Sequence, residues 1–228
     1  MIKLFFLGIK TKIKEIHDFL YTLQKYRRNT LFIKSYLQLK CLYLLKNPYA
    51  ISRKYLIQHD PANIYQYGET PIRTLNIIEQ YIPQEYHRTH LYELGAGSGY
   101  TTLYFRLIRH YSVTSIEMIS AFCQRIEYII QKNKISNTTI LNDDFLKIDF
   151  KQANIIYLYG SCMEITQIKK LIHIIKQQQQ KILIISISFA LSQYEKTGVF
   201  HKIHQHNITF FWGNTDVFIE EYNPTTTL

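Results

Sequence analysis

The sequence is poor in cysteine, glycine and proline, and it contains no long apolar run. The three cysteines are widely spaced and form no Cys-x-x-Cys pair, which argues against a disulfide framework or a zinc knuckle and suits a reducing compartment. The apolar run from Leu4 to Ile9 is short for a signal peptide and far short of the ~20 residues that cross a bilayer. We therefore expect a cytoplasmic protein, with attachment to a membrane surface left open.

What the sequence does contain is aromatic residues and positive charge, and the charge is concentrated at one end. Aromatic residues make up 14% and hydrophobic residues 46% of the 228, which is typical of a folded chain with one α/β domain and an appendage. Residues 1–57 hold 12 Lys or Arg and 2 Asp or Glu, whereas residues 58–228 hold 15 of each kind. This asymmetry indicates an anionic partner, either nucleic acid or a membrane surface, or only a solvated helical face.

The basic segment is predicted to be helical. Its apolar residues recur every three or four positions between Lys12 and Lys46, which predicts two amphipathic helices. The break falls at "RRNT", where Asn29 or Thr30 would cap the second helix, and Pro48 would end that helix.

A loop and a third helix are predicted to follow. Residues 58–74 contain two prolines and one glycine, which indicates a loop. It leads into a helix over 72–82, for which Thr70 would be the N-cap and Pro71 the first residue.

From residue 89 onward, short apolar runs and amphipathic stretches alternate. This order implies right-handed crossovers and a mostly parallel sheet, while the last segment predicts an antiparallel hairpin with a two-residue turn at Gly213-Asn214. The fold we expect is therefore α/β, a three-layer doubly wound sheet of seven mostly parallel strands that ends in the hairpin. We divide the chain into a basic helical segment, 1–60, and one domain, 61–228. The expected strands are 89–95, 112–118, 138–144, 153–160, 181–188 and the two arms of 208–222, with helices at 100–111, 119–134 and 163–179.

Three of the 8 glycines fall within residues 95–99, between a predicted strand and a predicted helix. There the chain must turn tightly, let a ligand approach its backbone, and point free amide groups at negative charge. Glu117 ends the next strand, 24 residues after Glu93, close to the ~20-residue offset at which an acid accepts hydrogen bonds from ribose hydroxyls. Tyr100 stands where a nicotinamide-binding motif has its third glycine, so the pattern disfavours NAD.

Four segments, in this order and spacing, resemble motifs I to IV of the seven-strand, Rossmann-like S-adenosylmethionine-dependent methyltransferases. They are "ELGAGSG", "SIE", "NDDF" and "IIYLYG", and the terminal hairpin is similar to the reversed last strand of that family. "YGETP", at 67–71, resembles the loop that closes over the cofactor in the non-SET histone-lysine methyltransferases. "IIYLYGSC", followed by a helix and "KILIIS", is similar to the lysine methyltransferases that act on the ATP-synthase c subunit. Across residues 65–222 the chain looks most like uncharacterised bacterial members of the family.

The resemblance implies S-adenosylmethionine as the cofactor and a role for each matching position. The glycine loop would pass beneath the methionine and ribose portions, and the loop before the first strand would close over the methionine end. Glu93 would organise the glycine loop and the methionine ammonium, and Glu117 would take the ribose hydroxyls. The other cofactor-binding residues expected on this basis are Gly95, Ala96, Gly97 and Gly99 below the cofactor, Tyr67, Glu69 and Thr70 above it, and Met118, Phe145 and either Asp144 or Asp143 at the adenine.

The resemblance also points to the catalytic side of the site. Tyr157, Tyr159 and Ser161 would face the transferring methyl, where an aromatic face stabilises a cation by ~0.5–2 kcal/mol. The chain lacks both the Asp/Asn-Pro-Pro-aromatic motif of nucleic-acid N-methyltransferases and the asparagine-rich segment of the histone-lysine group. Cys162 lacks the Pro-Cys context of a covalent nucleophile. We therefore expect a methyltransferase acting on a protein lysine amine, with nucleic acid disfavoured as acceptor.

Other interpretations remain open. The chain could be a small-molecule or lipid methyltransferase, or a non-catalytic module that binds the cofactor or nucleic acid. Glu117, Asp143 and Asp144 could be plain strand-end and turn charges, Glu69 could complement a helix dipole, and one of the two strand tyrosines could pack in the core. The histidines of "HKIHQH" are expected to be scattered on the surface just before a strand, with no metal site, and Trp212 to pack in the hairpin.

Overall fold

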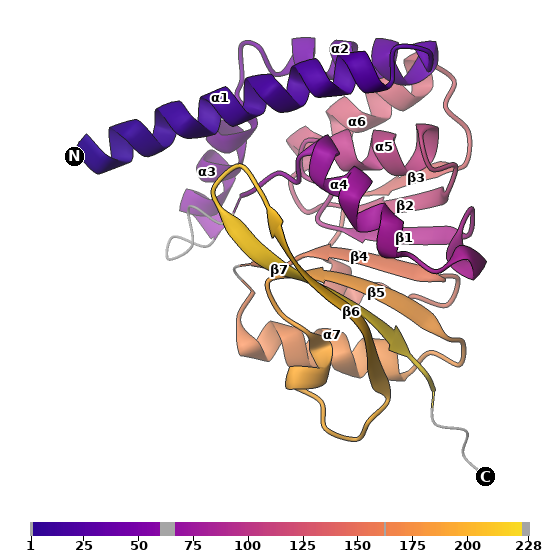
Figure 1. Ribbon diagram of the computed structural model, residues 1–228. Coiled ribbons are helices and arrows are strands. Elements are labelled where there is room, and N and C mark those ends of the chain that lie inside the picture. Colours follow the sequence, from indigo (N-terminus) through magenta and orange to yellow (C-terminus); the bar gives the residue numbers. More distant parts are fainter. Residues whose placement is uncertain (1, 60–66, 162, 225–228) are drawn as a thin grey trace.

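The computed structural model describes residues 2–59, 67–161 and 163–224, which form one twisted sheet with helices on both faces (Figure 1). The seven strands lie in the order β3-β2-β1-β4-β5-β7-β6. Neighbours from β3 to β5 pair in parallel, and β7 pairs antiparallel with both β5 and β6. The expected fold class is confirmed. The bounds are β1 (His90–Leu94), β2 (Ser112–Ile116), β3 (Thr138–Leu141), β4 (Ile155–Tyr159), β5 (Ile182–Ile187), β6 (Phe200–Thr209) and β7 (Asn214–Tyr222).

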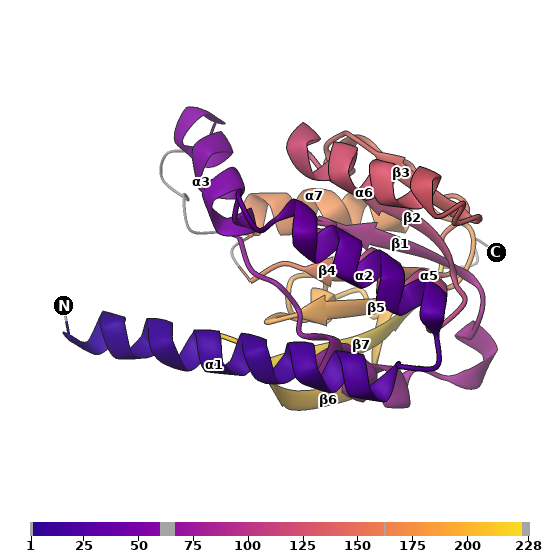
Figure 2. The same cartoon turned by 90° about the horizontal axis from the view of Figure 1, so that it is seen from above.

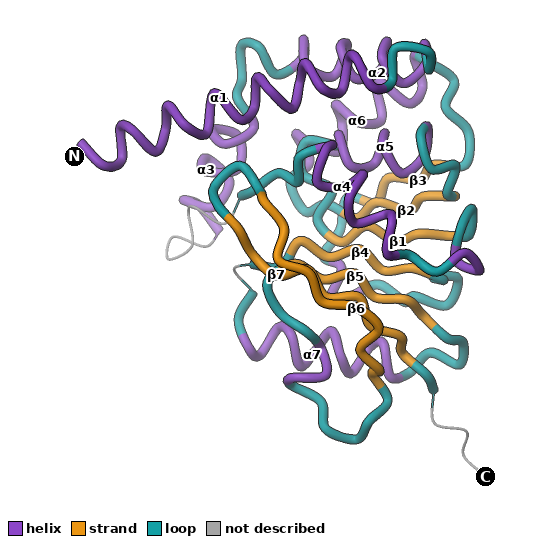
Figure 3. The backbone as a smooth tube through the Cα atoms, viewed as in Figure 1, coloured by secondary structure: helices purple, strands orange, loops and turns teal. Residues whose placement is uncertain are grey.

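The central strands are buried on both faces, because helices cover the sheet above and below (Figure 3). β5, "ILIISI", has every residue buried, as expected for an interior parallel strand. α4 (Ile72–Ile78), α5 (Tyr100–Leu107) and α6 (Ser120–Lys132) pack on one face. α7 (Ile165–Lys176) packs on the other. Single 3-10 turns lie at Glu79–Tyr81, Gln84–Tyr86, Phe145–Lys147 and Leu191–Gln193.

The basic N-terminal segment forms an outer layer in which α1 (Ile2–Lys25) packs on α4, and α2 (Thr30–Leu42) packs on α5 and α6 (Figure 2). The third helix of the segment, α3 (Pro48–His59), lies to one side of them. Asn29 caps α2, as one of the two expected candidates, because its side chain accepts a hydrogen bond from the Phe32 amide at 3.0 Å. Four aromatic and aliphatic side chains of this layer belong to the same buried cluster as the sheet: Phe32, Tyr36, Leu39 and Tyr43.

α3 was not expected from the sequence, which suggested only that Pro48 ends the helix before it. Pro48 instead begins α3, where a missing backbone N–H costs nothing, and the Asn47 side chain accepts a hydrogen bond from the Tyr49 amide at 2.9 Å. Only the ends of the predicted loop 58–74 can be compared, because residues 60–66 lie outside the described residues.

The expected cap of α4 is also wrong. α4 ends at Ile78, not at residue 82, and Pro71 occupies the N-cap position. The Asp18 carboxylate, from α1, accepts hydrogen bonds from the amides of Ile72 and Arg73 at 3.1 and 2.9 Å. The first turn of α4 is therefore held by a residue 54 positions earlier in the sequence.

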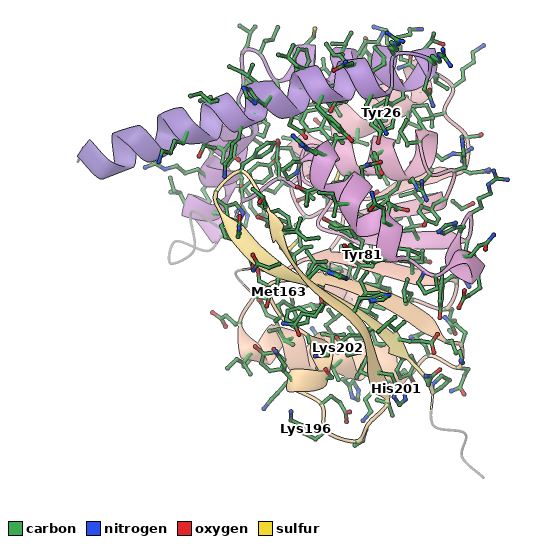
Figure 4. The ribbon with its side chains drawn as sticks, viewed as in Figure 1. Tyr26, Tyr81, Met163, Lys196, His201 and Lys202 are labelled. Atoms are coloured by element: carbon green, nitrogen blue, oxygen red, sulfur yellow. The ribbon has the colours of Figure 1, made fainter. Side chains whose placement is uncertain are left out.

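The hairpin is confirmed, but its turn is longer than expected. β6 begins at Phe200 and ends at Thr209, which pairs with Asn214, so four residues form the connection. The "HKIHQH" histidines therefore lie on the edge strand itself, where His201 and Lys202 are exposed (Figure 4). Among the described residues, no helix is long and apolar enough to cross a membrane.

Glu79 is an ionisable group that is buried away from the glycine loop. Glu79, which is 4% exposed, accepts a hydrogen bond from Arg109 Nε at 2.7 Å. Burial disfavours the charged carboxylate and raises the pKa of Glu79 to about 7, and the attraction of Arg109 offsets this only in part.

Candidate functional site

The glycine loop turns the chain from β1 into α5 at the point where the strand order reverses, which is where open α/β sheets bind ligands. Gly97 and Gly99 have φ of +53° and +86°, values that L side chains rarely adopt. A Cβ on Gly99 would lie 2.4 Å from Ile126 Cγ1, and one on Gly97 would lie 3.0 Å from Tyr67 Cε2. Only glycine therefore lets α6 and Tyr67 approach the loop this closely.

Glu117 holds the loop from the side. Its carboxylate accepts hydrogen bonds from the Gly97 amide and the Ile119 amide, each at 2.8 Å, one on each oxygen. The side chain is buried, and burial raises its pKa while the backbone amides lower it. Each carboxylate oxygen can accept a further hydrogen bond, so Glu117 can still receive the hydroxyls of a ligand.

A cavity of about 290 Å³, which we call the Glu117 cavity, opens beside this carboxylate. Met118 and Phe145, both expected at the adenine, line it, and Met118 is 46% exposed. Its outer wall comes from an element that the sequence did not predict. That wall is formed by residues of α3: Ser52, Tyr55, Leu56 and His59.

A second, smaller cavity lies above the glycine loop. We call it the Gly68 cavity, and its volume is about 30 Å³, roughly that of one water molecule in the liquid. Tyr67 covers Gly97, and a Cβ on Gly68 would lie 2.4 Å from Tyr159 Oη, so two aromatic side chains fill this region. Tyr67, Gly68, Gly95, Gly97 and Tyr159 line both cavities, which are therefore adjacent and share these residues as walls.

The structure brings together most of the residues expected at the methyl-transfer end. Tyr157 and Thr70 share a hydrogen bond of 2.6 Å between their hydroxyls, and both line the Gly68 cavity. Burial raises the pKa of Tyr157, so its phenol stays protonated. Tyr67 donates a hydrogen bond to Glu69 Oε1 at 2.6 Å. Ser161 is exposed and lines neither cavity.

Trp212 is a site residue that the sequence analysis assigned only to hairpin packing. Its ring does stack on Phe210, but its Nε1 also donates a hydrogen bond to Tyr159 Oη at 2.6 Å. The tip of the hairpin therefore positions a residue that lines both cavities. No local sequence signal reports a contact between positions 53 residues apart.

Glu93 lies below the loop and not in either cavity. It is 1% exposed, and its carboxylate accepts hydrogen bonds from the hydroxyls of Thr101, Thr102 and Ser115. Burial raises its pKa, against the effect of these three donors. The observed contacts tie β1 and β2 to the first turn of α5, and contact with a cofactor ammonium stays a prediction.

The two aspartates expected at the adenine act on their own loop. Asp144 caps a 3-10 turn by accepting a hydrogen bond from the Leu146 amide at 2.9 Å. Asp143 accepts one from the Asp144 amide at 2.7 Å, and neither lines the Glu117 cavity. Asn142, which was not expected, donates to the carbonyls of Glu117 and Met118 at 2.9 and 3.0 Å. It thereby fixes the end of β2 beside the cavity.

A third cleft connects the N-terminal helices with the site. This helical cleft has a volume of about 170 Å³, and Glu69 and Tyr100 line both it and the Gly68 cavity. Its lining combines aromatic rings with two carboxylates and two ammonium groups, and one pair of these, Lys12 and Glu15, forms an ion pair at 2.6 Å. The remaining lining residues come from α1, from α2 and from the connection to α3: Lys12, Glu15, Lys40, Tyr43, Leu44, Asn47, Pro48 and Tyr49.

Two further expectations concern side chains outside these cavities. In the part of the chain that the structure describes, no group of three His, Cys, Asp or Glu residues could hold a metal ion. His204 and His206 instead pack against the ring of Tyr81. The expectation for Cys162 lies outside the described residues.

Comparison with known proteins shows the fold. No protein-family model and no curated protein sequence matches the chain. The Bacillus subtilis M1A22 tRNA methyltransferase TrmK has a similar structure at 14% identity and a TM-score of 0.54, over 67% of this chain and 66% of that one. MtNAS in complex with MTA and tNA is similar at 10% identity and a TM-score of 0.52, over 83% and 76%.

A mutant of MtNAS in complex with S-adenosylmethionine is also similar, at 12% identity and a TM-score of 0.51, over 83% of this chain and 78% of that one. In a further structure of this mutant the match spans 61% of the neighbour's length. At such identities the likeness is one of architecture. The chain has the Rossmann-like α/β fold of the S-adenosylmethionine-dependent methyltransferases.

Proposed function

We propose that this protein is an S-adenosylmethionine-dependent methyltransferase whose acceptor is an amine. The observation that carries the proposal is the Glu117 carboxylate, bound to the Gly97 amide at the edge of a cavity of about 290 Å³. Tyr67 and Tyr159 lie between this cavity and the adjacent Gly68 cavity. A nucleoside with a charged side chain needs these parts in this order.

The residues present fit the cofactor at its nucleoside end. Glu117 would accept the ribose hydroxyls, and Met118 and Phe145 would lie against the adenine. At the methionine end the Gly68 cavity is too small, so binding would require Tyr67 and Tyr159 to move off the glycine loop. When bound, S-adenosylmethionine would supply a methyl group on a positively charged sulfur.

The chain's own residues would attract and align the acceptor and exclude water. Alignment to ~3–3.5 Å removes much of the entropic barrier, and the buried hydroxyls of Tyr157 and Thr70 would restrict the acceptor at the inner end of the site. The Glu69 carboxylate, which lines both the Gly68 cavity and the helical cleft, would attract an incoming ammonium, which must lose a proton to solvent before its nitrogen can attack.

The lining of the helical cleft supports an amine as the acceptor. Glu15 is paired with Lys12 at 2.6 Å, and Lys40 Nζ already lies 4.1 Å from the centre of the Tyr100 ring. The rings of Tyr43 and Tyr49 and the Glu69 carboxylate are the lining groups that favour an added cation. Within this class we propose the side chain of a protein lysine, whose extended carbon chain suits a narrow cleft.

A second candidate acceptor is RNA. The net charge of +10 resides in residues 1–57, and one structural neighbour, TrmK, is a tRNA methyltransferase. Positive charge supports binding to phosphates. It gives no preference for a methyl acceptor, so we rank RNA below lysine.

A two-stage experiment tests this proposal. Calorimetric titration with S-adenosylmethionine should give saturable binding, and its absence in folded wild-type protein would refute the proposed activity. Labelled S-adenosylmethionine is then added to a cell lysate together with wild-type protein or a Glu117→Ala variant. Label that is sensitive to protease, and that disappears when the lysate amines are first blocked by acetylation, supports lysine. Label that is sensitive to ribonuclease supports RNA and refutes the amine acceptor on protein.

A further inference from the structure

Helix α1 carries an exposed apolar stripe, whose first residue, Ile13, also lines a cavity between α1, α4 and the hairpin. Ile13, Ile16 and Leu20 are 49%, 56% and 57% exposed. Their spacing of three and four residues places them on one side of the helix. In the sequence the same spacing continues backward to Ile9 and Phe6.

The opposite face of α1 fixes the helix in this orientation. Asp18 and Thr22 are buried, and the Asp18 carboxylate accepts hydrogen bonds from the first two amides of α4. Lys14 Nζ also donates a hydrogen bond to the carbonyl of Phe210 at 3.1 Å, on the tip of the hairpin. The stripe cannot turn inward without breaking these contacts, so its exposure is a property of the folded protein.

The stripe is flanked by cationic residues and extends from the body of the protein. Lys10 and Lys12 are exposed at one end of α1, and Lys25, Arg27 and Arg28 are exposed at the other. α1 has 24 residues and is therefore about 36 Å long. Figures 1 and 2 both show its N-terminal part projecting past the rest of the chain.

Apolar exposure and positive charge coincide in the whole N-terminal layer. Of the 14 large hydrophobic side chains exposed in the described residues, 9 belong to residues 13–57, including Leu44 and Leu45 at 79% and 97%. Residues 1–57, which include this part, hold the excess of 10 positive charges. A helical face that is merely solvated would account for the charged side chains but not for the exposed aliphatic ones.

We propose that α1 binds the surface of an anionic lipid bilayer. Ile13, Ile16 and Leu20 would enter the boundary between headgroups and acyl chains, and the flanking Lys and Arg side chains would lie at the lipid phosphates. Nucleic acid would use the cations but not the stripe, because aliphatic side chains provide no stacking surface for bases. A bilayer uses both features. The proposal does not depend on the methyltransferase activity, since no cofactor is involved.

Flotation of the full chain with vesicles tests the proposal. Vesicles of phosphatidylcholine alone are compared with vesicles that contain about 30% phosphatidylglycerol, because an anionic surface attracts each nearby Lys or Arg. Wild-type protein should bind the anionic vesicles, and less so at high salt. An Ile16→Gln/Leu20→Gln variant should bind roughly tenfold more weakly or worse, since two exposed apolar side chains lose their contact with the lipid.

Two controls separate this effect from general stickiness and from unfolding. Ile165, on α7, is 58% exposed and Ile203, on β6, is 36% exposed, so Ile165→Gln/Ile203→Gln also removes two exposed apolar side chains, outside the N-terminal layer, and should leave binding unchanged. Far-ultraviolet circular dichroism should be the same for all variants. Absence of vesicle binding, or equal binding by the Ile16→Gln/Leu20→Gln variant, would overturn the proposal. Binding to polyuridylic acid without binding to anionic vesicles would also overturn it, and would indicate that the basic layer binds RNA.

Discussion

Replacement of Glu117 is the most direct test of the site, because its carboxylate both holds the glycine loop and, in our proposal, binds the ribose of the cofactor. Its two oxygens accept hydrogen bonds from the amides of Gly97 and Ile119 at 2.8 Å, and in our proposal each also accepts a hydrogen bond from a ribose hydroxyl. Loss of the two hydrogen bonds to the ribose would cost ~1.5–3 kcal/mol of binding free energy each, because the acceptor is charged. A Glu117→Ala variant should therefore bind S-adenosylmethionine about 10²–10⁴-fold more weakly.

The isosteric variant adds information about the loop. In Glu117→Gln one side-chain oxygen becomes an NH₂ group, which must then face either the Gly97 or the Ile119 amide, donor against donor. This leaves a buried donor unpaired at a cost of ~1–3 kcal/mol, so the variant should lose stability as well as affinity. Glu85, which is exposed, supplies the control: Glu85→Gln should change neither.

The assay is calorimetric titration with S-adenosylmethionine, beside urea unfolding of each variant. Binding by folded Glu117→Gln or Glu117→Ala protein within about threefold of wild type, equivalent to less than ~1 kcal/mol, would refute the assignment. Glu117 would then be a structural residue of the glycine loop, and the cofactor would have to be held elsewhere.

Three further outcomes are expected. Gly97→Ala should weaken cofactor binding by roughly tenfold or more, because a Cβ at φ +53° costs ~1–2 kcal/mol and would press on the Tyr67 ring. The control is Gly198→Ala, where φ is +83° and nothing lies within 4 Å of the added Cβ; it should leave cofactor binding unchanged. Trp212 is the single tryptophan, so displacement of Tyr159 by the cofactor should change its fluorescence saturably; an unchanged spectrum despite calorimetric binding would contradict the displacement. The pKa of Glu79 rises from 4.5 to about 7 on folding, so folded protein keeps a proton that unfolded protein has released between these values. The stability that Glu79 contributes, on the order of 3 kcal/mol, is thus present below pH 4.5 and lost as pH rises through about 7. The free energy of unfolding in urea should fall between ~pH 4.5 and ~pH 8 by this amount more in wild type than in Glu79→Gln. The same fall in both proteins would contradict the prediction.

Much of the fold could be predicted because the signals are local. Strands such as β5 are continuous apolar runs, since they are buried on both faces, and helices such as α6 repeat apolar residues with a helical period. Caps are also local where the partner is three residues away, as for Asn29 and Phe32. The expectation failed at α3, because a proline ends one helix and begins another equally well, and the choice depends on what the next turn packs against.

The candidate site likewise has parts that depend on local sequence and parts that depend on contacts between distant residues. The glycines of the loop could be predicted because a tight turn at positive φ restricts the residue type, whereas the cofactor-binding role of Glu117 stays a prediction. The contacts that shape the rest join distant positions: Asp18 with Ile72, Thr70 with Tyr157, and Trp212 with Tyr159. No periodicity or spacing encodes such pairs, because they form only when the sheet brings the carboxyl ends of its strands beneath the N-terminal helices. The same packing left Ile13, Ile16 and Leu20 exposed, although the sequence placed them in an apolar pattern that a core could equally have buried.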